Sequence, residues 1–259
     1  MNQMKIEKAQ VAQRFAKAGA SYTEHAIVQQ QICQSLFKLM QQQLSDIPLD
    51  RVFEIGCGTG NLTQLMLRNL PIKQLILNDL YPEVQQHFSP QQAIAWQIGD
   101  IEQIEYPTAL DLIVSSSALQ WMTDLDAVFK KCRAALKSQG YFCFSSFGQQ
   151  NLKQIKMLTG QGLDYLSIET LQEKLLMQGF EVLHLSQSIE NLNFAHPKQV
   201  LQHLQATGVT ATASKHRWSK QSLQQFYLDY EKFSFLDSCG QRVYSLSYHP
   251  IYCIARRTV

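Results

Sequence analysis

The segment 51–60, with the sequence RVFEIGCGTG, limits most strongly what this chain can fold into. Its first half is a short apolar run with strand character, and its second half has a glycine at every other position. Residues 61–69, which favour a helix, follow directly. Glycine has no Cβ, so the backbone can turn sharply there and come close to a ligand. The next helix would present unpaired N–H groups at its start. The segment therefore predicts a strand, a turn and a helix that bind a nucleotide-like cofactor.

The spacing of the glycines distinguishes between classes of cofactor. The dinucleotide fingerprint is G-x-G-x-x-G, but Gly56, Gly58 and Gly60 give G-x-G-x-G, and Asn61 takes the place of the third fingerprint glycine. Glu54 precedes the first glycine by two residues, and its carboxylate would repel a pyrophosphate and attract a cation. The pattern E-x-G-x-G-x-G resembles the first motif of class I S-adenosylmethionine (SAM) methyltransferases. SAM carries a sulfonium, an ammonium and a carboxylate but no phosphate, so the resemblance implies SAM as the cofactor.

Apolar runs with strand character alternate with helical segments through the first half of the chain. The expected strands are 52–55, 74–79, 93–98, 110–116 and 141–147, and the expected helices between them are 61–69, 82–87 and 124–136. Continuous apolar strands separated by helices indicate a parallel sheet covered on both faces. The expected fold class is α/β, with a Rossmann-like sheet of the class I methyltransferase type and a helical lid or insertion.

The remaining segments are mostly helical in pattern. Further helices are expected at 23–44, 167–179, 197–206 and 218–233, a long strand at 180–194 and a last strand at 243–255. We expect a single methyltransferase domain over residues 1–259. Its parts would be an N-terminal helical lid (1–46), a SAM-binding core (47–148), a helical insertion with a strand (149–235) and a C-terminal strand (236–259).

Polar residues at the carboxyl ends of the expected strands are the candidates for a site, because ligands of doubly wound sheets bind beyond those ends. Asp79 ends the second strand, nineteen residues after Gly60, and Leu80 follows it. A carboxylate there can accept hydrogen bonds from both ribose hydroxyls. Asp100 ends the third strand and can accept from the adenine amine, while the N–H of Ile101 can cap a ring nitrogen. A plain turn aspartate is the alternative at both places.

The fourth expected strand runs into the turn SSSALQW at 115–121. The backbone at Ser116 is a candidate to run alongside the methionine part of SAM. Trp121 either faces the substrate or belongs to the core. No catalytic dyad is obvious in the sequence. A carboxylate acceptor is already ionised at pH 7, so its methylation needs positioning and desolvation more than a general base.

Distinctive segments extend over nearly the whole chain: RFAKA at 14–18, YTEHA at 22–26, GDI at 99–101, LQW at 119–121, ATGVT at 206–210 and YSLSYH at 244–249. Together with the glycine motif they resemble the malonyl-acyl-carrier-protein O-methyltransferases of biotin biosynthesis. The resemblance implies SAM-dependent methylation of the free carboxyl of a malonyl thioester on acyl carrier protein, with malonyl-coenzyme A as the alternative substrate. It also implies that Tyr22 and His25 help to close the active site over SAM.

Cationic residues are expected on this reading at two places. The substrate carboxylate needs a cationic partner, preferably a bidentate arginine, and the acidic carrier protein needs a basic docking surface. The candidates for the first are Arg14, Arg217 and Arg242, and those for the second are Lys198, Lys215, Arg217 and Lys220.

Composition excludes several other classes of protein. Among 259 residues, 45% are apolar and 17% charged, as in a globular protein. The net charge of +2 gives no reason to expect binding to nucleic acid or to a membrane. No apolar run has the length of a membrane span, and the N-terminus lacks a secretory pattern. Six scattered cysteines form no C-x-x-C pair, so no metal site is expected. We expect a cytoplasmic protein, and the oligomeric state stays open.

Three other functions stay open at this point. A methyltransferase for a small-molecule carboxylate or hydroxyl would methylate a free acid and not the carrier thioester. A non-catalytic SAM-binding protein would form no S-adenosylhomocysteine with any acceptor. A nicotinamide dehydrogenase would bind NADH, but Glu54 and the missing third glycine disfavour it.

Overall fold

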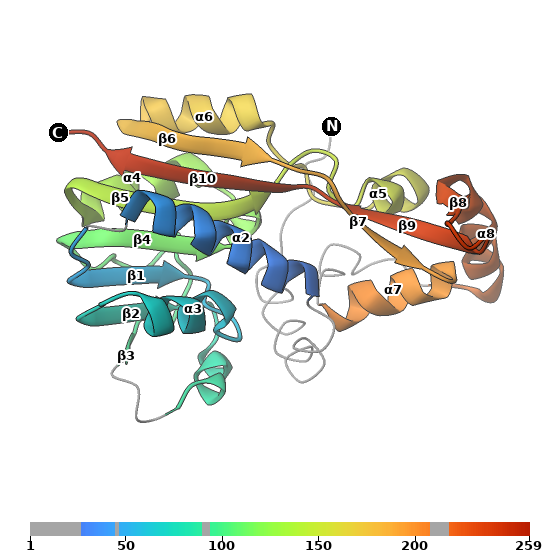
Figure 1. Ribbon diagram of the computed structural model, residues 1–259, viewed down its shortest axis with the longest axis horizontal. Helices are drawn as coiled ribbons and strands as arrows, with labels where there is room; N and C mark the ends of the chain where they lie inside the picture. The colour runs from blue at the N-terminus through green and yellow to red at the C-terminus, as the bar shows by residue number, and fades with distance from the viewer. Residues whose placement is uncertain (1–26, 45–46, 90–93, 208–217) are drawn as a thin grey trace. The chain divides into compact units, whose positions relative to one another are not determined.

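The computed structural model describes residues 27–44, 47–89, 94–207 and 218–259. The chain forms two compact units (Figure 1). The first, the seven-stranded unit, comprises residues 27–147, 166–187 and 251–259. The second, the three-stranded unit, contains residues 148–165 and the described part of 188–250. Among the described helices, none has the length and hydrophobicity that a membrane span requires.

The seven-stranded unit is built on a sheet with the strand order β3-β2-β1-β4-β5-β10-β6. β1 pairs in parallel with β2 and with β4, β2 with β3, and β4 with β5, whereas β10 runs antiparallel to β6. The strands are β1 (Arg51–Ile55), β2 (Gln74–Asn78), β3 (Ile94–Trp96), β4 (Leu110–Ser116), β5 (Leu136–Phe147), β6 (Phe180–Gln187) and β10 (Pro250–Arg257). The predicted parallel arrangement of the first five strands is confirmed.

The direction of the strand order reverses between β1 and β4. From β1 the chain moves outward through β2 to β3, and it then returns to the other side of β1 as β4. Ile55 pairs with Ser115, so both strands end at the same level. In open α/β sheets, ligands bind outside the carboxyl ends of the strands at such a reversal. This edge of the sheet is therefore where a site is expected.

Helices of the same unit follow the expected segments. They are α2 (Ile27–Leu44), α3 (Asn61–Asn69), α4 (Leu125–Ala135) and α6 (Ile168–Met177), with the 3-10 turns η1 (Pro82–His87) and η2 (Leu119–Trp121). Asp124 caps α4 by accepting from the N–H of Ala127 at 2.9 Å, and Ser167 caps α6 by accepting from Thr170 at 3.2 Å. Such caps pair one of the N–H groups that a helix start leaves open.

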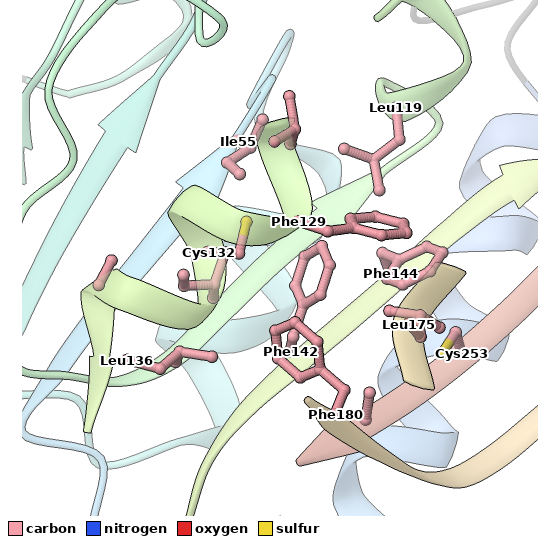
Figure 2. Packing of buried hydrophobic residues seen from close by; sticks show 14 of the residues in the cluster. Ile55, Leu119, Phe129, Cys132, Leu136, Phe142, Phe144, Leu175, Phe180 and Cys253 are labelled. Atoms are coloured by element: carbon pink, nitrogen blue, oxygen red, sulfur yellow. The ribbon is translucent and has the colours of Figure 1, made fainter. Parts of the chain in front are cut away.

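Buried aromatic side chains form the core beside β5 (Figure 2). Phe142 and Phe144 of β5 lie on one face of the strand, with ring centroids 5.7 and 5.9 Å from that of Phe129 in α4. Phe142 also lies 5.8 Å from Phe180 of β6. Burial of each such ring contributes about 1.5–3 kcal/mol. Leu119 of η2 belongs to the same cluster, so the core anchors the turn that follows β4.

The three-stranded unit has a small antiparallel sheet with the order β7-β9-β8. Its elements are β7 (Glu190–Phe194), β8 (Ser234–Leu236), β9 (Arg242–Tyr248), α5 (Lys153–Thr159), α7 (Pro197–Ala206), α8 (Lys220–Tyr230) and η4 (Glu231–Phe233). Buried polar pairs join helices to strands. His203 of α7 shares a 2.8 Å hydrogen bond with the hydroxyl of Tyr248, and the hydroxyl of Tyr230 donates to the carbonyl of Ser245 at 3.0 Å.

Two strands that the sequence predicted as continuous are divided in the structure. The expected strand 180–194 forms β6 and β7, and the expected strand 243–255 forms β9 and β10. The breaks lie at Ser188 and at His249, and the N–H of Ser188 donates to the carbonyl of Pro250 at 3.1 Å. Pro250 itself has no N–H to donate. Each segment thus contributes a strand to both sheets. The single-strand predictions were wrong because apolar residues lie on both sides of each break.

Two short elements were not predicted. α5 has seven residues and β8 has three. Leu152, which precedes α5, is left-handed with φ 52° and gives no side-chain cap. The helix therefore lacks the usual start signal. The expected helix at 23–44 is described from Ile27 onward, and the division of the chain into lid, core, insertion and C-terminal strand stays a prediction.

Candidate functional site

The glycine-rich loop joins β1 to α3. Gly56, Gly58 and Gly60 have φ values of 70°, 52° and 84°, a region that glycine enters without steric cost. The N–H groups of Gly56 and Cys57 both donate to the carbonyl of Asn78, each at 3.0 Å. The loop is thereby held against the carboxyl end of β2.

The space around the three glycines differs. A Cβ on Gly56 would lie 2.5 Å from the Cβ of Ala118, and a Cβ on Gly60 would lie 2.9 Å from the ring of Phe88. A Cβ on Gly58 would meet no atom of the described residues within 4 Å. The packing of the protein itself therefore requires Gly56 and Gly60, whereas Gly58 borders open space from which a ligand can approach the backbone.

Glu54 is the last charged residue of β1 and is only 1% exposed. Its Oε2 accepts a hydrogen bond from the hydroxyl of Thr63 in α3 at 2.6 Å. The pKa of Glu54 is raised to about 8, chiefly by burial and in smaller part by the carboxylate of Asp79, while the bond from Thr63 acts in the opposite direction. The side chain joins the strand and the helix on either side of the glycine loop. Its predicted contact with a cationic cofactor stays a prediction.

Asp79 lies directly after β2 and is 8% exposed. Its carboxylate accepts from the N–H of Gly58 at 2.8 Å and of Leu80 at 2.7 Å, and the N–H of Tyr81 is a third donor. Burial raises the pKa of Asp79, and these backbone bonds partly oppose that rise. A carboxylate has about four acceptor positions, which leaves capacity for about one more donor. The predicted binding of ribose hydroxyls by Asp79 and the predicted cofactor contact of Leu80 stay predictions, with less free capacity than two hydroxyls need.

The turn after β3 is fastened to the end of β2. The side-chain amide of Asn78 donates to the carbonyls of Gln97 at 2.8 Å and Gly99 at 3.0 Å. The N–H of Gly99 donates to the backbone carbonyl of Asp79 at 2.8 Å. These bonds bring the predicted ribose and adenine segments to the same edge of the sheet.

Asp100 and Ile101 follow this turn. Asp100 is half-buried, and its Oδ1 accepts from the N–H of Glu102 at 3.0 Å. Ile101 is buried in the hydrophobic core. Their proposed contacts with adenine stay predictions, but their position at the shared edge agrees with them.

β4 ends at Ser116, whose hydroxyl lies 3.0 Å from the hydroxyl of Ser145 in β5 and 3.3 Å from the thiol of Cys33 in α2. Ser117 has φ 57°, in the left-handed region, and its N–H donates to the hydroxyl of Ser145 at 3.2 Å. A non-glycine residue in this region stores strain, which is common at functional sites. The predicted contact of Ser116 with the methionine part of SAM stays a prediction.

Trp121 closes η2, the 3-10 turn that follows. It is half-buried, and its N–H donates to the carbonyl of Ala118 at 3.1 Å. Leu119 of the same turn is a core residue, so packing anchors the turn that carries Trp121. A catalytic role for Trp121 stays a prediction.

The predicted residues that remain are the lid residues and the cationic residues. Five of them lie outside the described residues: Tyr22, His25, Arg14, Lys215 and Arg217. Arg242 is exposed and donates to the hydroxyl of Ser234 at 2.7 Å. Lys198 and Lys220 are exposed in the first turns of α7 and α8. Roles in carboxylate binding and carrier docking stay predictions.

Sequence reasoning missed the residues that fix the loop in place. Thr63, Asn78 and Phe88 contact Glu54, the glycine loop and Gly60 respectively. Thr63 lies in the first turn of the helix after the motif, and a hydroxyl so close to Glu54 in the sequence was a signal that could have indicated a partner for its carboxyl group. Asn78 is part of an apolar strand, where one amide does not interrupt the pattern.

Comparison with known proteins relates this geometry to a family. Residues 53–144 match the family model described as a methyltransferase domain. Over 255 residues the chain is 49% identical to the malonyl-[acyl-carrier protein] O-methyltransferase of Acinetobacter baylyi, and the alignment covers 98% of each chain. The chain belongs to the malonyl-[acyl-carrier protein] O-methyltransferase family.

Solved structures relate the members of this family to a wider fold. A Bacillus halodurans protein provisionally identified as a methyltransferase superposes with a TM-score of 0.63 at 15% identity, covering 87% of this chain and 100% of that one. Phosphoethanolamine N-methyltransferase 2 of Haemonchus contortus, solved with SAM, has a TM-score of 0.51 at 14% identity, with coverage of 86% and 52%. At such identities the likeness establishes the fold alone. The predicted class I methyltransferase fold is confirmed.

Membership of the malonyl-[acyl-carrier protein] O-methyltransferase family also confirms the resemblance found in the sequence. The chain is a SAM-dependent methyltransferase, and the glycine loop lies within the matched domain. The dehydrogenase alternative is thereby excluded.

Proposed function

We propose that this protein transfers a methyl group from SAM to the free carboxyl of a malonyl thioester on acyl carrier protein. The observation that carries the proposal is the 49% identity to the A. baylyi protein of that name, over 98% of both chains. The methyl ester hides the charge of the carboxylate, so that fatty-acid enzymes can extend the chain as a pimelate precursor. The reaction would be an early step of biotin synthesis.

The residues present fit SAM. Gly58 leaves open space beside the backbone, and the buried carboxylate of Asp79 keeps capacity for a further donor. Asp79 and Asp100 would hold the adenosine part, and the turn after β4 would hold the methionine part. SAM, when bound, supplies a methyl group on a cationic sulfur with a neutral leaving group.

The electrostatic environment of the loop favours a cation over a phosphate. Glu54 and Asp79 are both buried close to it, and each has a raised pKa. A nearby positive charge lowers the pKa of a carboxyl group. A cationic ligand is therefore stabilised by the ionised form of Glu54, while a phosphate would keep that side chain protonated.

For the acceptor, the task of the protein is to position and desolvate a carboxylate. The malonyl carboxylate is ionised at pH 7 and needs no general base. Holding it in line with the methyl group converts a bimolecular encounter into a unimolecular step.

We propose acyl carrier protein as the partner, with coenzyme A as the alternative carrier of the malonyl group. We also propose that the protein is cytoplasmic. All six cysteines are free thiols, and reducing compartments keep thiols in that state.

The test is an intact-mass measurement of malonyl-acyl carrier protein incubated with the enzyme and SAM. The expected result is a mass gain of one CH₂, together with S-adenosylhomocysteine. Succinyl-carrier and unloaded carrier serve as matched controls, and malonyl-coenzyme A and free malonate are run beside them. Methylation of free malonate but not of the carrier thioester would show that the proposed acceptor is wrong. SAM binding with no S-adenosylhomocysteine from any acceptor would indicate a binding protein instead.

A further inference from the structure

Four buried oxygen atoms of the seven-stranded unit have no hydrogen-bond partner in the part of the chain that the structure describes. They are Oε1 of Gln29, the hydroxyl of Tyr106, Oγ of Ser117 and Oε1 of Gln120. Buried polar atoms in native proteins are nearly always paired, and each exception needs an explanation. The hydroxyl of Tyr106 belongs to a ring that packs against the core residue Phe53. Of the other three, two lie in the turn after β4 and one lies on α2.

Gln29 is placed close to that turn by its own helix. It is 6% exposed and precedes Cys33 by four residues, so the two side chains lie on one face of α2. The thiol of Cys33 lies 3.3 Å from the hydroxyl of Ser116, the last residue of β4. Figure 1 shows α2 running against the direction of β1, so its first turn lies toward the end of the sheet where the parallel strands finish. Gln29 is therefore about one helical turn, or about 5.4 Å, beyond the contact at Ser116.

Gln120 and Ser117 are each held in place by a nitrogen atom, and their unpaired oxygen atoms take no part in this. The side-chain amide nitrogen of Gln120 donates to the carbonyl of Ser117 at 2.5 Å. This bond fixes the orientation of the amide and identifies the unpaired atom as an acceptor. Ser117 is held through its backbone N–H, which donates to Ser145. The turn is thus preorganised, and the hydroxyl of Ser117 and the amide oxygen of Gln120 have no partner among the described residues.

The chemistry of the unpaired atoms identifies the group they would bind. The amide oxygens are acceptors and need a donor, but the carboxylate and thioester of the acceptor substrate have no N–H or O–H at pH 7. In SAM, the ribose hydroxyls and the adenine amine are expected beyond β2 and β3, across β1 from β4. The ammonium group of the methionine part carries three N–H donors and a positive charge.

We propose that Gln29 and Gln120 accept hydrogen bonds from the ammonium group of SAM, with the hydroxyl of Ser117 as a third acceptor. This inference rests on the proposed SAM-dependent function. It assigns Gln29 a role in positioning the cofactor, since the residue touches the amino-acid part and not the reacting carbon.

The test compares Gln29→Leu with Gln31→Leu by titration calorimetry. Gln31 lies on the same helix and is exposed, so it is the matched control. Gln29→Leu should raise the Kd of both SAM and S-adenosylhomocysteine about tenfold to hundredfold, as expected for loss of a hydrogen bond to a charged group. The Kd of 5′-methylthioadenosine, which lacks the amino-acid part, should not change. Gln31→Leu should change none of these values, and Gln120→Leu should repeat the selective loss.

Thermal melting without ligand is the second readout. Because Oε1 of Gln29 has no partner among the described residues, Gln29→Leu should leave Tm of the ligand-free protein unchanged or raise it. A merely structural glutamine would lower Tm on substitution and weaken SAM and 5′-methylthioadenosine equally, which would overturn the inference.

The variant Gln29→Glu distinguishes the ammonium from the carboxylate of SAM. It keeps an acceptor and adds a negative charge, so it should bind SAM more tightly than Gln29→Leu does. Weaker binding by Gln29→Glu than by Gln29→Leu would mean that the side chain faces the carboxylate, and the inference would be wrong. Wild-type binding of SAM without methylation of malonyl-carrier would contradict only the proposed acceptor, so the two failures can be told apart.

Discussion

The carboxyl ends of β2 and β4 lie on either side of β1, and their hydrogen bonding differs. After β2, the carboxylate of Asp79 accepts from backbone N–H groups, and the carbonyl of Asn78 accepts from two more. After β4, the buried oxygens of Ser117 and Gln120 have no partner among the described residues. The chain itself pairs most of the acceptor capacity of the first network, whereas the buried oxygens of the second have no partner among the described residues. A completed network supports the fold, whereas an incomplete one is ready for a ligand that brings the missing donors.

Because of this difference, substitutions at the two edges should affect different quantities: the free energy of unfolding at one edge and the affinity for the cofactor at the other. Substitutions after β2 should lower the free energy of unfolding of the ligand-free protein. Substitutions after β4 should leave that free energy nearly unchanged and lower the affinity for the cofactor. Thr63 already pairs the carboxyl group of Glu54, which lies near the end of the strand between the two edges. Substitution of Glu54 should therefore change mainly the free energy of unfolding, as expected for the edge after β2.

The largest expected effect is the pH dependence removed by Glu54→Gln. The pKa of Glu54 is raised from 4.5 to about 8, so the folded protein holds a proton that the unfolded chain has lost between these pH values. The unfolding free energy of the wild type therefore falls as pH rises from 4.5 to about 8. Relative to Glu54→Gln, the fall should reach up to about 4 kcal/mol.

Urea unfolding at several pH values between 5 and 8 measures this effect. Asp79 also has a raised pKa, but it is present in both proteins, so the difference between them isolates Glu54. Parallel stability curves for wild type and variant would show that Glu54 is ionised in the folded protein.

The next effect is the loss of the acceptor at the end of β2. Asp79→Ala leaves the N–H groups of Gly58 and Leu80 without their partner. Each buried unpaired group costs about 1–3 kcal/mol, so the unfolding free energy should fall by about 3 kcal/mol. Asp79→Asn keeps one acceptor oxygen and should lose about half as much. If Asp79→Ala unfolds at the same urea concentration as the wild type, the contrast between the two edges does not hold.

A smaller effect is expected where the two edges meet, at Gly56 and Ala118. Gly56→Ala places a Cβ 2.5 Å from that of Ala118 at a φ of 70°, and should lower the unfolding free energy by about 2 kcal/mol. Gly58→Ala has a positive φ but open space, so it should cost about 1 kcal/mol. Combining Gly56→Ala with Ala118→Gly should restore part of the loss in urea unfolding. No recovery in the double variant would mean that backbone strain, and not the contact, causes the loss.

How much of this could be predicted from the sequence differs between the two edges. The edge after β2 was predictable, because the strand pattern, the glycine spacing and the position of Asp79 are local in the chain. The edge after β4 was predicted only as a segment. That Gln29 lies beside it depends on how α2 packs on the sheet, and no spacing in the sequence expresses that packing.

The same reasoning explains the errors in the fold. Five parallel strands followed from alternating apolar and helical segments, each of which is a local pattern. The breaks at Ser188 and His249 divide strands between two sheets, and both sheets bury apolar residues. The apolar pattern therefore resumes after each break, and the only local signs of the change of sheet are the polar run 186–188 and the missing N–H of Pro250.

The smallest expected effect is the most direct test of the difference between the two edges. It compares Ser117, in the turn after β4, with Ser145 of β5, which is hydrogen-bonded to that turn. Ser145→Ala removes an oxygen that accepts from the N–H of Ser117 and bonds to the hydroxyl of Ser116, and should lower the unfolding free energy by about 1 kcal/mol. Ser117→Ala removes a buried oxygen that has no partner among the described residues. It should change the unfolding free energy by less than about 0.5 kcal/mol, because no hydrogen bond is lost and an unpaired polar atom is removed. Urea unfolding of both variants without ligand measures the difference. If Ser117→Ala costs as much as Ser145→Ala, then a group of the protein or an ordered water already pairs its hydroxyl, and the turn after β4 is as complete as the edge after β2.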